Sequence, residues 1–248
     1  MPAWEHVTCD VCGGRGQPVF DLPHPDAPGG FSQVLACPGC DLKYLSPRPA
    51  YEAMSRYYTD DSNAFVGRRR SIWKQVGWNL LRDLRVPYFD VNPRPVGEVL
   101  DVGCGYGDIL LYLQTRGARC IGVDADARAV ARAREYGLDV RLGRLEQQRF
   151  STASFDTVVL CHSLEHMHAP RALLAEVRRV VKPHGIVHIA VPSADSPAFG
   201  PAWRHLSFPL HLFHFTPASL EHCVRSVDLV PVFSATRREI IRMQCRRA

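Results

Sequence analysis

From residue 96 onward, the chain alternates between short apolar runs and longer segments that repeat an apolar residue every three or four positions. The short runs predict buried strands at residues 98–103, 120–124, 139–143, 155–161 and 185–191. The periodic segments predict helices at residues 108–117, 126–137 and 170–185. Strands that alternate with helices in this way predict an α/β fold, in which helices cover both faces of a parallel sheet.

Cap residues and later apolar segments extend this pattern to the carboxyl end of the chain. Asp126 stands where the N-cap of a helix is expected. A further helix is predicted at residues 217–226, with Thr216 as its N-cap. Two apolar segments, 229–237 and 238–245, then predict a pair of strands that completes the sheet.

The first part of the chain has a different character. Residues 1–49 are rich in cysteine, proline and glycine and have only short apolar runs. They predict a small module that cannot bury a large core and needs another source of stability, such as a bound metal ion. Residues 50–95 predict a helical linker or lid, because apolar residues recur at helical spacing at Ile72, Val76, Leu80 and Leu84. Residues 96–248 are then the main α/β domain.

Composition and charge restrict the class of protein. The 248 residues are 46% hydrophobic, which is enough to bury a substantial core. The formal charge of +5 suits an acidic ligand or an RNA surface but requires neither, so nucleic acid stays as an alternative partner. The sequence lacks an apolar run near the roughly 20 residues that a membrane span needs. Its start, MPAWEHVTCD, does not resemble a signal peptide, and we therefore expect a cytoplasmic protein without a membrane partner.

Four of the nine cysteines form two CxxC pairs. Cys9 and Cys12 make the first pair, and Cys37 and Cys40 make the second. Each short spacing lets two thiolates turn toward one ion, and four thiolates close a tetrahedral zinc site with no position left open. The alternatives are two unrelated turns or a redox CxxC. Neither pair follows a strand in a βαβ unit, as a redox motif does, so we predict structural zinc.

A glycine-rich loop follows the first strand of the main domain. Asp101, Gly103, Gly105 and Gly107 alternate along it, so the backbone can pass close to a ligand. The dinucleotide fingerprint needs a glycine where Asp108 stands, and a P-loop lysine is missing. Asp124 ends the next strand, where a carboxylate can accept both hydroxyls of a ribose. The pattern predicts a nucleotide-like cofactor other than NAD or ATP.

These segments resemble a known family. LDVGCGYGDILLYL, IGVDAD and FDTVVLCHSLEHMHAPRALLAEVRRVVKPHGIVHIAVPS are similar to class I S-adenosylmethionine-dependent methyltransferases. CDVC and CPGCDLKYLSPRP, followed by RYY, resemble the zinc-ribbon segment that precedes this domain in some members. The resemblance implies a Rossmann-like, mostly parallel sheet with an antiparallel carboxy-terminal strand, preceded by a four-cysteine zinc module and a helical linker. It also implies S-adenosylmethionine as the methyl donor.

The resemblance also implies which residues bind the cofactor. The glycines would wrap its amino-acid and ribose portions, with Asp101 supporting the loop, and Asp124 would hold the ribose hydroxyls. Ala125 and Leu145 would lie near the adenine. Arg144 departs from the acidic residue common in the family, which puts a polar adenine contact there in doubt. The full expected set is Asp101, Gly103, Cys104, Gly105, Gly107, Asp124, Ala125, Leu145, Cys161 and His162.

Methyl transfer needs a positioned acceptor and, for a hydroxyl, a base that removes its proton. Histidine suits this role, and the candidates are His211, His214 and His166. For each one the alternative is a packed, hydrogen-bonded histidine that supports the fold. We do not expect His211 and His214 to bind metal, because no carboxylate or third histidine at helical spacing completes a site.

The segment 196–217 leaves the carboxyl end of the fifth strand, where open α/β sheets bind ligands, and we expect it to form the acceptor pocket or its lid. Its aromatic residues line the pocket or fill a core beneath it: Trp203, Phe208, Phe213 and Phe215.

The sequence favours O- or N-methylation of a small molecule. In the alternative, an RNA or protein methyltransferase, the zinc module and Arg68–Arg70 would bind the polymer. CHSLEH follows the fourth strand in place of an NPPY-type element or a Pro-Cys nucleophile, which disfavours that alternative. A third hypothesis is a non-catalytic module that keeps the fold for binding. The intact glycine loop and Asp124 count against it.

Overall fold

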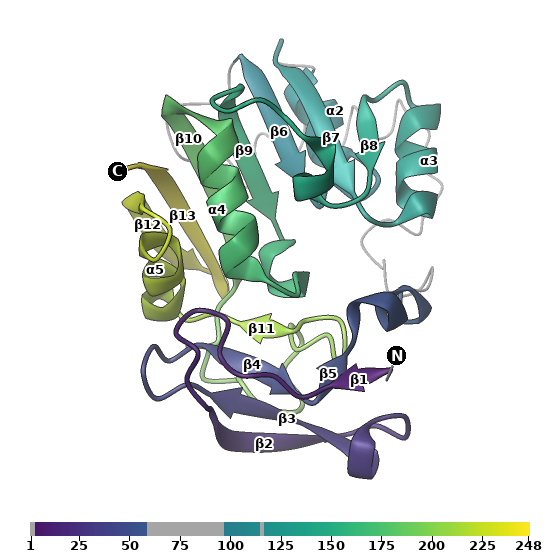
Figure 1. The fold of residues 1–248 in the computed structure, drawn as a ribbon, viewed down its shortest axis with the longest axis vertical. Helices are drawn as coiled ribbons and strands as arrows, with labels where there is room; N and C mark the ends of the chain where they lie inside the picture. The colour runs from purple at the N-terminus through teal and green to yellow at the C-terminus, as the bar shows by residue number, and fades with distance from the viewer. Residues whose placement is uncertain (1–2, 59–96, 115–116) are drawn as a thin grey trace.

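The computed structural model describes residues 3–58, 97–114 and 117–248, which form a large sheet, a smaller sheet and a two-stranded ladder (Figure 1). Most of the linker predicted at 50–95 lies outside the described residues, including its apolar stripe and Arg68–Arg70. Its first residues form the 3-10 helix η2, Tyr51–Arg56. Among the described helices, none has both the length and the apolar character needed to cross a membrane.

The large sheet has seven strands in the order β12-β13-β10-β9-β6-β7-β8. Five of them are parallel: β6 (Glu98–Val102), β7 (Arg119–Asp124), β8 (Val140–Leu142), β9 (Phe155–Cys161) and β10 (Val181–Pro192). Antiparallel pairing adds β13 (Ile240–Arg247) beside β10 and β12 (Leu229–Arg237) beside β13. The predicted mostly parallel sheet with an antiparallel carboxy-terminal strand is therefore confirmed.

Alternate residues of the strands fill two separate cores. Val99 and Val159 point to one face, where they pack with α2 (Asp108–Gln114) and α3 (Ala127–Glu135). Leu100 and Val158 point to the other face, where they pack with α4 (Pro170–Val180) and α5 (Pro217–Arg225). Helices therefore cover both faces, as the sequence pattern predicts.

The predicted helix at 170–185 is too long at its carboxyl end. Helix α4 ends at Val180, and Val181 is extended and already pairs with Phe155 of β9. The reason lies in the next two residues, because Lys182 precedes Pro183 and a residue before proline disfavours the helical conformation.

The amino-terminal module builds the smaller sheet. Its strands are β2 (Gln17–Pro23), β3 (Phe31–Ala36) and β4 (Lys43–Ser46), and they are antiparallel. The fourth strand, β11 (Phe213–His214), comes from the distant segment after β10 and pairs with β4. A separate ladder joins β1 (Trp4–Glu5) to β5 (Arg48–Pro49). The sheet thus crosses the boundary predicted at residue 49.

The module lies against the carboxyl ends of the parallel strands (Figure 1). Leu45 of β4 donates its N–H to the carbonyl of Leu212 at 3.0 Å, and one continuous core joins the module to the large sheet. Thr216 caps α5 as predicted, since its side chain accepts from the N–H of Ser219. The edge of the sheet where the ligand is expected is therefore lined by both parts of the chain.

Candidate functional site

The glycine loop connects β6 to α2. Gly103, Gly105 and Gly107 all have positive φ, the conformation that favours glycine. A Cβ at Gly103 would lie 2.5 Å from Cβ of Ser163, whereas one at Gly105 would meet nothing within 4 Å. The loop therefore packs tightly at its start and leaves open space at Gly105, where a ligand can approach the backbone.

Asp124 at the end of β7 holds this loop in place. Its Oδ2 accepts from the N–H of Gly105 at 2.8 Å, and its Oδ1 accepts from the N–H of Asp126 at 2.8 Å. Burial raises the pKa of Asp124, and these two hydrogen bonds act in the opposite direction. Each carboxylate oxygen keeps a lone pair, so Asp124 can accept two ribose hydroxyls as well.

Asp101 lies beneath the loop and is 1% exposed. Neither of its carboxyl oxygens has a hydrogen-bond partner among the described residues, and burial, followed by the charge of Asp124, raises its pKa to about 8. The sequence predicted that Asp101 supports the glycine loop. In the structure the hydrogen bond from the loop goes to Asp124.

The other expected cofactor residues divide into two groups. Ala125 is exposed, and Cys161 and His162 lie half-buried at the end of β9, all near the carboxyl edge of the sheet. Leu145 is 1% exposed within the core on one face, and Cys104 is buried in the core on the other. An adenine contact from Leu145 would therefore come from a side chain that the core already packs.

Two of the three candidate histidines meet beside the end of β9. The 3-10 helix η4, Leu164–His166, follows that strand, and Leu212 donates its N–H to the carbonyl of Glu165 at 2.9 Å. This backbone contact places the rings of His166 and His211 at right angles, with centroids 4.5 Å apart. Burial lowers the pKa of both histidines, and their proximity lowers that of His211 further.

Glu165 completes a cluster with these two histidines. One donor atom from each of Glu165, His166 and His211 lies within 4.8 Å of the others. The sequence expectation concerned His211 and His214 with a partner at helical spacing, whereas the neighbours of His211 in this cluster come from η4, which precedes α4.

His214 is not one of the three clustered donors, although its ring centroid lies 6.4 Å from that of His211. Its ring packs against the rings of Phe199 and Trp203, and its Nε2 is buried with no hydrogen-bond partner among the described residues. Burial lowers its pKa to about 3, with a further contribution from Lys43. These neighbours make His214 a packed histidine beside the site. The buried aromatic residues nearby, Trp203, Phe213 and Phe215, likewise belong to the core.

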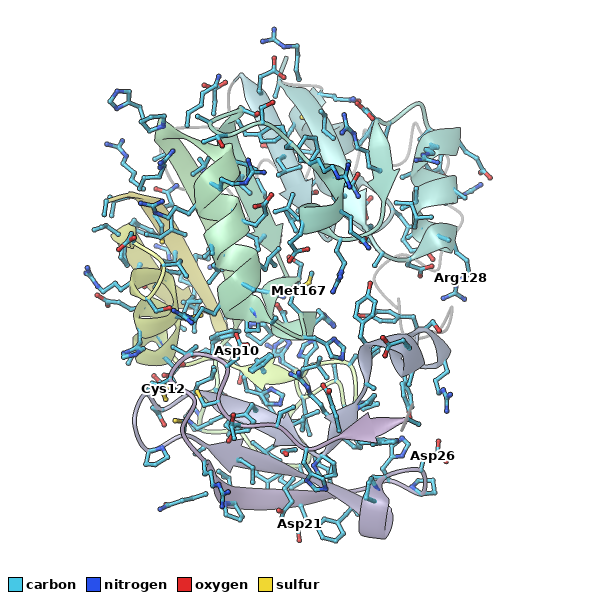
Figure 2. The ribbon with its side chains drawn as sticks, viewed as in Figure 1. Asp10, Cys12, Asp21, Asp26, Arg128 and Met167 are labelled. Atoms are coloured by element: carbon cyan, nitrogen blue, oxygen red, sulfur yellow. The ribbon has the colours of Figure 1, made fainter. Side chains whose placement is uncertain are left out.

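Sequence reasoning did not identify Tyr58 as part of the site. Its hydroxyl lies 3.5 Å from Nδ1 of His166, and burial raises its pKa. His162, expected on the cofactor side, places Nδ1 3.4 Å from Oε1 of Glu165. Met167, which follows η4 and is labelled in Figure 2, lies where the large sheet meets the module. The RYY run near the start of the predicted linker is the sequence signal that could have pointed to Tyr58.

The four cysteines of the CxxC pairs come together in the module. The Sγ atoms of Cys9 and Cys40 are 3.4 Å apart, those of Cys12 and Cys37 are 3.3 Å apart, and those of Cys12 and Cys40 are 3.8 Å apart. Zn–S bonds of about 2.3 Å in a tetrahedral site place sulfur atoms about 3.8 Å apart. The cluster therefore fits a four-thiolate zinc ion.

Matching backbone turns hold the two pairs. Gly13 donates its N–H to the carbonyl of Cys9 at 2.8 Å, and Asp41 donates to the carbonyl of Cys37 at the same distance. Gly13 and Asp41 both have positive φ. The second turn also contacts the acceptor side of the site, since Thr216 donates its hydroxyl to Oδ2 of Asp41 at 3.3 Å. The cysteine cluster is thus connected to the segment that carries His211.

Comparison with protein families gives a match over most of the chain. A family model described as a methyltransferase domain matches residues 72–232. A ubiquinone biosynthesis O-methyltransferase of Paracidovorax citrulli is 28% identical over 141 residues, which cover 49% of this chain and 59% of the relative. One of the same description from Hahella chejuensis is 34% identical over 111 residues, which cover 42% of this chain and 47% of the relative.

Solved structures share the fold. The 1,6-didemethyltoxoflavin-N1-methyltransferase of Burkholderia thailandensis, solved with its substrate and S-adenosylhomocysteine, aligns with a TM-score of 0.55 at 20% identity. This alignment covers 88% of the present chain and 96% of that protein. The chain spans only about half of the first two curated relatives, so likeness in sequence is confined to part of each protein.

Proposed function

Because the chain belongs to the S-adenosylmethionine-dependent methyltransferases, we propose that it methylates an oxygen or nitrogen atom of a small-molecule acceptor. One observation carries the proposal: the glycine loop with Asp124 and the cluster of Glu165, His166 and His211 lie at the same edge of the sheet. Two similar proteins are named for O-methylation in ubiquinone biosynthesis, and a structural neighbour is named for N-methylation of a small molecule.

The residues fit the expected methyl donor. Asp124 has lone pairs for the ribose hydroxyls, and the open space at Gly105 lets a ligand approach the backbone. When bound, S-adenosylmethionine supplies a methyl group on a positively charged sulfur. A lone pair of the acceptor forms the new bond to the methyl carbon, and the pair of the broken carbon–sulfur bond stays on the sulfur. The chain's part is to align the acceptor and take its proton.

We assign removal of the proton to the Glu165, His166 and His211 cluster. Burial keeps both imidazoles neutral near pH 7, so each has a nitrogen lone pair. Zinc at the four cysteines has a structural role, because their four thiolates leave no coordination position open. The alternative of a polymer substrate depends on the zinc module and on Arg68–Arg70, and these three arginines lie outside the described residues.

Calorimetric titration with S-adenosylmethionine tests the cofactor assignment. The wild-type chain is expected to bind, and Asp124→Ala is expected to weaken binding about 10- to 100-fold, since hydrogen bonds to a charged group contribute about 1.5–3 kcal/mol. Asp126→Ala is the matched control, because Asp126 caps α3 through the N–H of Arg128. Absence of binding by the wild-type chain would overturn the proposal.

Replacing His211 tests the assignment of the acceptor side. His211→Ala is expected to lower kcat at least about 100-fold, the usual contribution of a group that removes a proton, and to leave the affinity for S-adenosylmethionine unchanged. His188→Gln is the control, because His188 is also buried but contacts Gln244 on β13. Once an acceptor is found, steady-state kinetics measures both variants. A loss of less than about threefold in His211→Ala would remove His211 from the mechanism.

A further inference from the structure

We propose that Glu165, His166 and His211 bind a divalent transition-metal ion, best matched by zinc, and that this ion binds the hydroxyl of the acceptor. The role of the ion rests on the proposed function, whereas the binding site rests on the geometry alone. It is separate from the four-cysteine cluster, which lies in the amino-terminal module.

The buried carboxylate is the first observation. Glu165 is 1% exposed, and neither Oε1 nor Oε2 has a hydrogen-bond partner among the described residues. A buried carboxylate without partners is costly, so such groups are paired with cations or coordinate metals. His162 lies 3.4 Å from Oε1 and is charged only when protonated, and Oε2 has no such neighbour among the described residues. A metal ion would satisfy both oxygens.

The orientation of His166 is the second observation. Its Nδ1 lies 3.1 Å from the carbonyl oxygen of Leu210. Because a carbonyl can only accept, Nδ1 carries the proton and Nε2 keeps the lone pair. A histidine that binds metal usually donates its other N–H to a carbonyl or carboxylate, and this bond fixes both its tautomer and its orientation. His166 therefore already has the arrangement of a metal ligand.

His211 provides the third donor. It is 8% exposed, and its buried Nδ1 has no hydrogen-bond partner among the described residues. Three separate donors, of which Glu165 and His211 are buried and His166 is half-buried, thus meet within 4.8 Å.

The donor set indicates both the metal and its use. Two histidines and one carboxylate bind catalytic zinc and leave the fourth position open for water or substrate. A hydroxyl bound to zinc has a lowered pKa and loses its proton to solvent near neutral pH. The resulting oxyanion forms the bond to the methyl carbon, while the carbon–sulfur pair leaves with the sulfur. The cluster then promotes removal of the proton through the ion that His211 helps to hold.

Metal content of the full-length chain tests the site. After loading with zinc and dialysis, the wild-type chain is expected to hold about two ions, one at the cysteines and one at the cluster. Glu165→Gln and His211→Asn place a polar, uncharged side chain at each position and are each expected to hold about one ion. His188→Gln, the buried-histidine control, is expected to hold about two. A wild-type chain with one ion, or two variants that keep the second ion, would overturn the proposal.

Cobalt substitution distinguishes the two sites and checks that the variants fold. Cobalt at four thiolates gives intense sulfur-to-metal charge-transfer absorption, whereas cobalt at nitrogen and oxygen ligands gives only weak d–d bands. The variants are expected to lose the weak bands alone, and retained charge-transfer absorption shows that the module is folded. If the variants keep both the weak bands and the charge-transfer absorption, the proposed site is contradicted. If S-adenosylmethionine binds but the second ion does not, the metal site is rejected and the proposed function stands. If the second ion binds but S-adenosylmethionine does not, the proposed function is rejected and the metal site stands.

Discussion

Replacement of Cys37 by serine is expected to abolish zinc binding at the four-cysteine cluster, which fits a structural zinc ion, and to unfold the amino-terminal module. Cys37 is 1% exposed, and its N–H and carbonyl close the turn that leads into β4. Structural zinc contributes on the order of 10 kcal/mol of binding free energy, which is comparable to the whole stability of a typical domain. Without it, the module keeps only the core that it shares with the large sheet, and that core is small for an antiparallel sheet of this length.

The consequence extends to the acceptor side of the site. β4 pairs with β11, and Leu45 bonds to Leu212, so an unfolded module releases the segment that carries His211. Hydrogen exchange should show protection lost in β2 to β4 and in residues 210–216, and metal analysis should show the zinc lost. Cys120→Ser, which removes a buried cysteine of β7 outside the cluster, should keep its zinc and its protection. Full protection of β4 in Cys37→Ser would contradict this prediction.

Substitution of Gly103 by alanine is expected to destabilise the main domain. At φ +72, an alanine is strained by about 1–3 kcal/mol, and its Cβ would lie 2.5 Å from Cβ of Ser163. The contact is between atoms fixed to the backbone, so either the loop or η4 must move, at a further cost of about 1–3 kcal/mol. Urea denaturation should show a loss of about 2–6 kcal/mol, together with weakened binding of S-adenosylmethionine.

Gly105 supplies the matched comparison. It also has positive φ, yet a Cβ there meets nothing within 4 Å. Gly105→Ala is therefore expected to cost only the backbone strain, about 1–2 kcal/mol, while its methyl group occupies the space where the ligand approaches. Urea denaturation of Gly105→Ala should therefore lie closer to that of the wild-type chain than Gly103→Ala does, while its affinity for S-adenosylmethionine should be strongly reduced. Equal stability losses in the two variants would show that the contact with Ser163 does not limit the loop.

Some features of the fold and site followed from local patterns. The alternation of strands and helices predicted the layers, because the side chains of a strand alternate between two faces and those of an amphipathic helix gather on one. The positions of the glycine loop and Asp124 were also predictable, because both stand at the ends of neighbouring parallel strands. The structure joins them through the bond from Gly105 to Asp124.

Other features depended on contacts that no local pattern contains. The resemblance implied that Asp101 supports the glycine loop; the structure adds that its carboxyl oxygens are buried without hydrogen-bond partners among the described residues and that the N–H of Gly105 donates to Asp124. The extent of α4 was overestimated because apolar periodicity continued to Val181, although Pro183 already limits the helix.

By itself, the sequence determined the class of fold, the four-cysteine cluster and the positions of the glycine loop and Asp124, because each is set by short spacings or by adjacent strand ends. Only the tertiary structure decided the acceptor side. Glu165 and His166 are far from His211 in sequence, and they meet because the segment after β10 returns to pair with η4 and β4. Pairing between segments so far apart in sequence depends on packing of the whole chain. The tertiary structure therefore distinguishes the two candidates: His211 joins the cluster, and His214 packs in the core.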